Sequence, residues 1–163
     1  MLATDVDTLD ITDAQQVKNV VERENPDVII NTAAYTKVDA CETDELTAFL
    51  VNAHGARNLA VAAYAIGAKI LQASTDYVFA GTGNTPLREY DPIDPPNVYG
   101  KSKALGEQLV MATNPRHFVV RTAWLYGDGP NFVRTILKLA KEQEELRVVN
   151  DQVGTPTSTV DLA

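Results

Sequence analysis

Tyr99 and Lys103, two side chains that can take part in proton transfer, stand four positions apart in the segment YGKSK. On a helix, this spacing places both side chains on one face, about one turn apart. The charge of a lysine at about 4 Å is worth roughly 4 kcal/mol at an effective dielectric of about 20, and it favours the ionised form of a phenol. We therefore expect Lys103 to lower the pKa of Tyr99 and to make Tyr99 a proton donor at neutral pH.

A second group of polar residues follows the apolar run AKILQA at 68–73, which predicts a buried strand. Its end carries hydroxyl or carboxylate groups on consecutive residues, namely Ser74, Thr75, Asp76 and Tyr77. Ligands of open α/β sheets bind at the carboxyl ends of strands. A Thr75 hydroxyl that holds a substrate oxygen, with Tyr99 supplying the proton, suits the reduction of a carbonyl group by hydride. An isolated Tyr-x-x-x-Lys is more often a solvated helix face, and the strand end upstream is what favours this chemistry.

The segment 81–97 between these two groups has the composition of a loop. Regular structure is excluded by four prolines, Pro86, Pro92, Pro95 and Pro96. The loop is longer than most connections in a compact domain, and such length is typical of loops with a function.

The composition favours one domain that binds a small ligand. The chain has 163 residues, of which 45% are hydrophobic, and a net charge of -8, which argues against nucleic acid or an anionic membrane surface as the partner. His54 and His117 lack metal-ligand spacing, so we expect no metal, and the single Cys41 is interpreted as a small buried hydrophobe. With no apolar run of membrane-spanning length and no signal peptide, a cytoplasmic protein is expected.

The order of the predicted elements indicates an α/β fold with a doubly wound parallel sheet. Helices are expected at 12–25 with a capping box of Thr12 and Gln15, at 43–67 from a Thr43 cap, from 98 onward, and at 131–145. Strands are expected at 28–31, 68–73, 118–121 and 146–149. The polar residues of the 43–67 helix, Asn52, His54 and Asn58, are interpreted as packing or surface residues.

Small residues follow the 28–31 strand in NTAAYT, at Asn31 to Thr36. They allow a flat ligand to approach the backbone, and tight packing of a loop is an equally good explanation. Trp124 follows the 118–121 strand, where it can be a core residue or can stack on a planar ligand.

Three segments, STDYVF, NVYGKSKALGE and RTAWLYG, resemble the extended short-chain dehydrogenases/reductases, and among them the family of dTDP-4-dehydrorhamnose reductases. The resemblance runs along nearly the whole chain and implies a Rossmann-like fold. It implies a catalytic set of Thr75, Tyr99 and Lys103. In this family the tyrosine protonates the C4 oxygen of the sugar, the lysine binds the nicotinamide ribose, and the threonine polarises the carbonyl.

The resemblance also implies the ligands, which are NADPH or NADH and a dTDP-linked 4-keto-6-deoxy sugar used in polysaccharide precursor synthesis. The implied cofactor-binding residues are Asp10, Ile11, Ala34, Tyr35, Thr36, Ala73, Tyr99 and Lys103. The implied substrate-binding residues are Thr75, Asp76, Tyr77 and Trp124. No metal is implied, and a homodimer is left open.

The sequence departs from the family pattern in lacking the glycine-rich turn that holds a pyrophosphate. We expect residues 1–163 to be a partial dinucleotide-binding domain, incomplete at both ends, in which a substrate-binding lobe begins at about 151. Two alternatives share the Tyr–Lys helix: a non-catalytic regulatory subunit of the methionine adenosyltransferase type, and a sugar-nucleotide epimerase or dehydratase.

We predict that the 163-residue segment made by itself binds dinucleotide poorly and shows no reductase activity, because the anion site for the pyrophosphate is missing from it. Calorimetric titration with NADH and NADPH measures this. Micromolar binding by the monomeric segment would show that the glycine-rich turn is dispensable.

Overall fold

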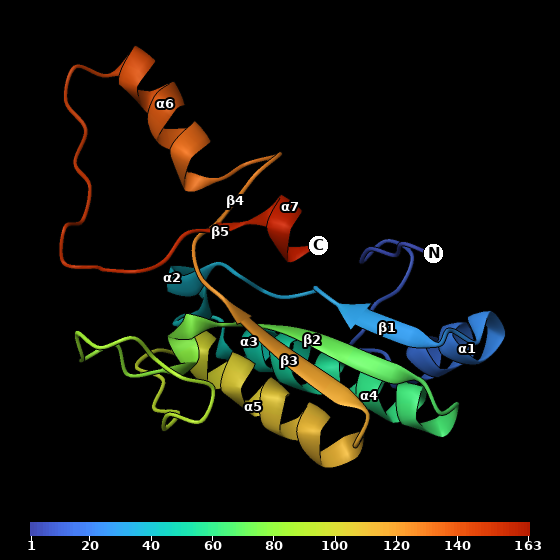
Figure 1. The fold of residues 1–163 in the computed structure, drawn as a ribbon. Helices are drawn as coiled ribbons and strands as arrows, with labels where there is room; N and C mark the ends of the chain where they lie inside the picture. Colours follow the sequence, from blue (N-terminus) through green and yellow to red (C-terminus); the bar gives the residue numbers. More distant parts are fainter. The chain divides into compact units, whose positions relative to one another are not determined.

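The computed structural model describes residues 1–163 and divides them into two units, Met1–Arg121 and Thr122–Ala163 (Figure 1). The elements of the first unit are α1 (Ala14–Glu24), β1 (Val28–Asn31), α2 (Val38–Cys41), α3 (Glu45–Phe49), the π-helix η1 (Leu50–Gly55), α4 (Ala56–Ala65), β2 (Lys69–Thr75), the 3-10 helix η2 (Asp76–Val78), α5 (Val98–Thr113) and β3 (His117–Thr122), whose last residue is assigned to the second unit. The second unit contains β4 (Leu125–Tyr126), α6 (Phe132–Glu142), β5 (Thr157–Ser158) and α7 (Thr159–Leu162).

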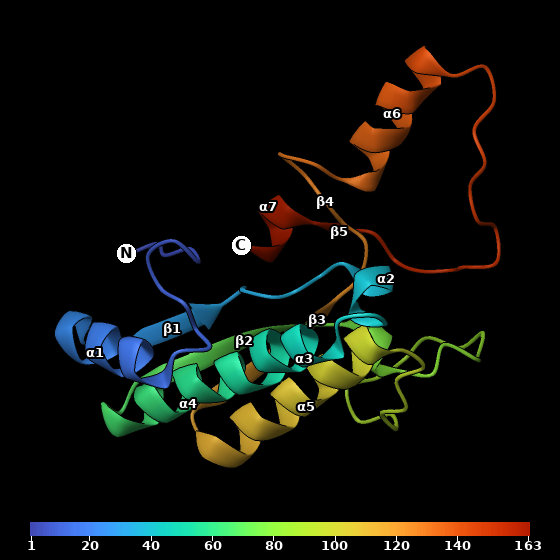
Figure 2. The ribbon, with the colours of Figure 1, turned by 180° about the vertical axis from the view of Figure 1, so that it is seen from behind.

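The sheet of the first unit has the strand order β1-β2-β3. β1 and β2 are parallel, with Val28 opposite Lys69 and Asn31 opposite Gln72. Figures 1 and 2 show α1, α4 and α5 as one layer on one face of this sheet. Helices alternate with the strands along the chain, and the predicted α/β, Rossmann-like class is confirmed.

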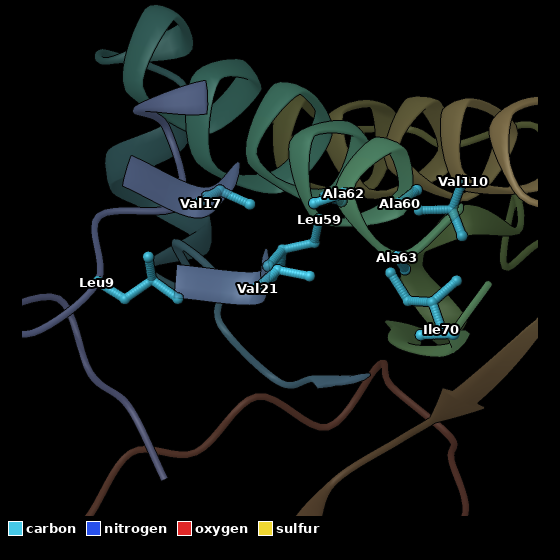
Figure 3. Packing of buried hydrophobic residues seen from close by; sticks show 11 residues of the cluster. Leu9, Val17, Val21, Leu59, Ala60, Ala62, Ala63, Ile70 and Val110 are labelled. Carbon is cyan, nitrogen blue, oxygen red and sulfur yellow. The ribbon is translucent and has the colours of Figure 1, made fainter. Parts of the chain in front are cut away.

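Between the helix layer and the sheet lies a core of small and branched apolar side chains (Figure 3). Val17 and Val21 of α1 meet Leu59 of α4, and Ile70 of β2 is fully buried. The α4 face that joins this core is rich in alanine, at Ala56, Ala60, Ala62 and Ala63. Small side chains let helix and sheet approach closely, and this gives the backbone near the site its fixed position.

α1 begins one residue later than the capping box predicts. Its N-cap is Asp13, whose Oδ1 accepts hydrogen bonds from the N–H groups of Gln15 and Gln16 at 2.9 and 3.0 Å. The predicted capping box of Thr12 and Gln15 was wrong because the Thr12 hydroxyl donates instead to Asp10, at 2.7 Å. The helix ends before Pro26, where Asn25 adopts a left-handed conformation with φ 42°.

The helix predicted at 43–67 is present as the run α3, η1 and α4, which we call the long helix. It begins after Asp44, which accepts a hydrogen bond from the N–H of Thr47, rather than after Thr43. Its middle turns are a π-helix, a wider winding that is frequent at functional sites.

The second unit departs from the sequence prediction at 146–149. Those residues form no strand, because they join no hydrogen-bonded ladder, and Val148 and Val149 are exposed. The strand pair of this unit is β4 with β5, parallel, with Leu125 opposite Thr157. The predicted helix at 131–145 is confirmed over the shorter range Phe132–Glu142.

None of the helices combines the length and the apolar composition that crossing a membrane requires.

α5 packs against the long helix without room for a side chain at one position. A Cβ atom on Gly106 would lie 2.2 Å from the backbone oxygen of Asn52. Backbone cannot move aside as a flexible side chain can, so this close approach fixes the distance between the two helices.

We predict that Gly106→Ala in the full-length protein lowers the free energy of unfolding by about 1–3 kcal/mol, the usual cost of overpacking. The clash is with backbone, which places the cost toward the upper end of this range, where a gain of up to about 1 kcal/mol in helix propensity offsets it only in part. Urea denaturation measures the change. Gly83→Ala is the control, since a Cβ there meets nothing closer than the Thr85 hydroxyl at 4.0 Å, and equal stability of the two variants would contradict the close-packing argument.

Candidate functional site

Thr75 closes β2 and begins the short helix η2. Its buried hydroxyl accepts a hydrogen bond from the N–H of Tyr77 at 3.2 Å and donates one to Oδ1 of Asp76 at 3.1 Å. The first of these bonds caps η2, which turns the chain away from the sheet at this point. Three of the predicted strand-end residues are therefore joined in one local network.

Tyr99 lies in the first turn of α5, which begins where Asn97 accepts a hydrogen bond from the N–H of Gly100 at 2.8 Å. The Tyr99 ring meets the Tyr77 ring edge-on, with 5.8 Å between the centroids. Burial raises the pKa of Tyr99 above its ordinary value, although a hydrogen bond with the side chain of Thr75 acts in the opposite direction. The fold thus brings Thr75, Tyr77 and Tyr99 together.

Lys103 lies one turn further along α5 and is 4% exposed. Its Nζ donates a hydrogen bond to the backbone oxygen of Ala73 at 2.7 Å, so the ammonium is held against β2. Burial lowers the pKa of Lys103 to about 8, against the opposing effect of the Glu107 carboxylate.

The expectation that Lys103 lowers the pKa of Tyr99 is wrong for this structure. Burial outweighs the favourable interactions of the phenolate, and the groups that shift the pKa of Tyr99 do not include Lys103, whose ammonium is bound at Ala73. The raised pKa still leaves Tyr99 protonated at neutral pH. Tyr99 is therefore placed to give a proton rather than to take one.

Asn52 of η1 joins the loop after β1 to α5. It is 1% exposed; its Oδ1 accepts from the N–H of Tyr35 at 2.8 Å, and its Nδ2 donates to the Tyr35 oxygen at 3.1 Å and to Oγ of Ser102 at 2.9 Å. Ser102 Oγ in turn donates to the Tyr99 backbone oxygen at 2.8 Å. Asn52 is expected from the sequence to be a packing or surface residue, and the sequence does not predict this link. The available signal was an amide within a helix face of alanines.

Asn58 of α4 likewise joins the long helix to another segment of the chain, the one that contains Ile11. Its Nδ2 donates to the backbone oxygen of Ile11 at 3.0 Å, and the Ile11 side chain lies against Gly55, where a Cβ would be 2.6 Å away. Asp10, which precedes Ile11 in the chain, accepts hydrogen bonds from the hydroxyl and the N–H of Thr12, and these bonds lower the pKa of Asp10. The long helix thus holds both predicted cofactor segments, 10–11 and 34–36.

Two further residues behave as the sequence indicates. Cys41 is a fully buried free cysteine, and burial raises the pKa of its thiol. It lies in a small core with Ala48 and Val98, against which Tyr35 and Tyr99 both pack. His54 is exposed.

Trp124 belongs to the second unit and is 46% exposed, so it is not a core residue there. A Cβ on Gly154 would lie 2.9 Å from the indole ring of Trp124. The backbone oxygen of Trp124 accepts a hydrogen bond from the N–H of Thr157 at 3.3 Å. The indole therefore packs on the segment 151–157, DQVGTPT. Contact of Trp124 with a substrate stays a prediction.

The side chains at the end of β2 fit a nicotinamide ribose. Lys103 has three N–H groups, of which Ala73 takes one, so two are left for ribose hydroxyls. Tyr99 adds a phenol that can both donate and accept. The chemistry of these donors suits a dinucleotide bound with its nicotinamide half at this end of the sheet.

A Rossmann-like sheet that gathers threonine, tyrosine and lysine at the end of one strand is the arrangement implied by the resemblance to extended short-chain dehydrogenases/reductases. The model of the RmlD substrate-binding domain family matches residues 1–163, the whole chain. The chain therefore belongs to the RmlD substrate-binding domain family.

The chain is similar to curated proteins about twice its length. It is 48% identical over 156 residues to the spore coat polysaccharide biosynthesis protein SpsK of Bacillus subtilis, covering 95% of this chain and 55% of that protein. It is 48% identical over 157 residues to a dTDP-4-dehydrorhamnose reductase of Streptomyces griseus, covering 95% of this chain and 52% of that one. The chain thus spans about half the length of these relatives.

Solved structures agree with this assignment. A dTDP-4-dehydrorhamnose reductase of Clostridium acetobutylicum matches with a TM-score of 0.96 at 53% identity, over 99% of this chain and 57% of that one. The reductase of Bacillus anthracis, solved in complex with NADP, matches with a TM-score of 0.94 at 49% identity, over 98% of this chain and 57% of that one.

We predict that Lys103 makes the stability of the full-length protein rise with pH between about 8 and 10.5. Its pKa in the folded protein is about 8 against an ordinary value of 10.5, so the unfolded chain binds more protons across this window. The rise is at most about 3 kcal/mol. Denaturant unfolding at several pH values should show it in the unmodified protein and in the exposed-site control Lys101→Met, and not in Lys103→Met. The same slope in all three proteins would contradict the lowered pKa.

Proposed function

We propose that the full-length protein reduces the C4 keto group of dTDP-4-dehydro-L-rhamnose to give dTDP-L-rhamnose, with NADPH or NADH as the reductant, in polysaccharide precursor synthesis. The observation that carries the proposal is the gathering of Thr75, Tyr77 and Tyr99 at the end of β2, with Lys103 fixed one turn along α5 by the carbonyl of Ala73. The names of the relatives support the same reaction.

Tyr99 acts as the general acid. When bound, the nicotinamide supplies the hydride that reaches C4, and the carbonyl oxygen gains negative charge as this happens. The phenol of Tyr99 gives that oxygen its proton, so hydride and proton together convert the ketone to an alcohol. The raised pKa of Tyr99 keeps the phenol protonated before the reaction. It also makes the phenol a weaker acid.

Thr75 holds the reacting oxygen. Its hydroxyl now donates to Asp76 at 3.1 Å, which is long for a bond between two oxygens. Such a weak bond can be exchanged for one to the substrate carbonyl. Asp76 and Tyr77, which flank Thr75 in η2, are proposed to contact the sugar, and Trp124 to contact the sugar nucleotide.

Lys103 holds the nicotinamide ribose through the two N–H groups that Ala73 does not use. Ala73 contributes to cofactor binding through its carbonyl, which orients Lys103. The other proposed cofactor contacts come from segments fixed on the long helix: Asp10, Ile11, Ala34, Tyr35 and Thr36. The buried free thiol of Cys41 suits a reducing compartment, and we propose the cytoplasm.

We predict that Tyr99→Phe in the full-length protein lowers kcat by roughly 10²–10⁴, the usual contribution of a general acid, and leaves the fold intact. Consumption of NADPH with the keto sugar nucleotide measures kcat, and circular dichroism checks the fold. Tyr64→Phe, at an exposed position on α4, is the matched control. Near-normal turnover by Tyr99→Phe would contradict the assignment of Tyr99 as the general acid.

The same assay separates the alternatives. A reductase consumes one NADPH for each sugar reduced, whereas an epimerase or dehydratase regenerates its cofactor and a regulatory subunit shows no turnover.

A further inference from the structure

Glu107 follows Lys103 by one turn of α5 and is 0% exposed. It forms a two-pronged ion pair with Arg121 of β3, with 2.9 Å from Nε to Oε1 and 2.6 Å from Nη2 to Oε2. Paired hydrogen bonds of this kind fix the direction of both groups as well as their distance. The ion pair therefore sets how the end of β3 meets α5.

The Arg121 guanidinium has two further contacts. Its Nη1 donates to the backbone oxygen of Glu89 at 3.0 Å, and its Cζ lies 4.9 Å from the centroid of the Phe79 ring. Phe79 directly follows η2, and Glu89 lies within the loop of residues 80–97. One guanidinium thus connects α5, β3, the chain after η2 and the middle of the loop.

The loop has little else in its middle to hold it. Residues 81–90 are exposed. Within the loop, the Arg88 side chain donates a hydrogen bond to the Tyr90 hydroxyl at 2.7 Å, and the Asp91 carboxylate accepts one from the Arg88 N–H at 2.7 Å. The end of the loop is fixed separately, where the N–H of Asp94 donates to the Val78 oxygen at 3.0 Å. Arg121 is therefore the anchor for the segment 80–92.

A buried ion pair is a poor explanation for stability, because replacing both partners with apolar side chains of similar size is often neutral or stabilising. Unlike two apolar side chains, the ion pair fixes the direction in which the Arg121 guanidinium points. Without Glu107, Arg121 has no partner that points its guanidinium at Glu89 and Phe79.

We propose that Glu107 and Arg121 are positioning residues that hold the loop 80–92 against α5 as a wall of the sugar-binding side of the site. The loop connects the strand end that carries Thr75 to the helix that carries Tyr99, and the proposal is that its position affects how a substrate fits beside these two residues. The cofactor segments are fixed elsewhere, by Asn52 and Asn58. The part of this proposal that concerns substrate rests on the proposed reductase function.

Hydrogen–deuterium exchange on the full-length protein tests the anchor without any assay of activity. The double variant Glu107→Met/Arg121→Met keeps the site filled and leaves no unpaired charge. We expect faster exchange in peptides from 80–92 and unchanged exchange in the long helix. Lys18→Met/Glu22→Met, which removes the exposed ion pair of α1, is the control and should leave the loop unchanged.

Arg121→Lys is the second variant, because it keeps a positive charge beside Glu107 but cannot also reach Glu89 with a second prong. We expect it to release the loop as the double variant does. Loop exchange that equals that of the unmodified protein in both variants would overturn the proposal.

Steady-state kinetics test the consequence for substrate. In Arg121→Lys, which keeps the Glu107 carboxylate that acts on Lys103, we expect the KM for the keto sugar nucleotide to rise roughly tenfold, with kcat and the cofactor Kd within about twofold of the unmodified protein. A fall in kcat with unchanged KM would overturn the role as a substrate wall. If the unmodified protein shows no turnover, the proposed function fails, and the exchange experiment still decides whether the pair anchors the loop.

Discussion

The contact between α5 and the long helix at Asn52 is the constraint on which the rest of the site depends. The backbone of Asn52 lies so close to Gly106 that no side chain fits, and its buried amide must find partners for its polar atoms. It finds them in Tyr35 on one side and in Ser102 on the other. The loop after β1 and α5 therefore keep one relative position.

Burial shapes the electrostatics of the site more than pairing does. The same loss of solvent raises the pKa of Tyr99 and lowers the pKa of Lys103, because each shift favours the neutral form. Glu107 opposes the shift of Lys103, and its own charge is balanced by Arg121. The result is a phenol that keeps its proton at neutral pH and an ammonium with an altered pKa, held by a backbone carbonyl.

Sequence reasoning predicted the residues of the candidate site better than their interactions. The Tyr99 and Lys103 spacing, the end of β2 at Thr75 and the class of the fold were all accessible from local pattern, because periodicity and strand ends are local properties. The direction of the Tyr99 pKa shift was not, because it depends on burial by segments far apart in the chain. The prediction of a strand at 146–149 was wrong for a related reason. A strand needs a partner strand, and an apolar run in the sequence does not show which segment that partner is.

The sequence by itself determined the α/β order of the chain, the polar strand end, the position of the Tyr–Lys pair on one helix face and the family resemblance. Only the tertiary structure decided that Asn52 holds the loop after β1 at Tyr35, that Asn58 holds Ile11 and that Ala73 holds Lys103. It also decided that Arg121 reaches Glu107, Phe79 and Glu89 at once. These contacts join residues that lie far apart in the chain, and a hydrogen bond between such residues exists only when packing brings donor and acceptor to within about 3 Å of each other.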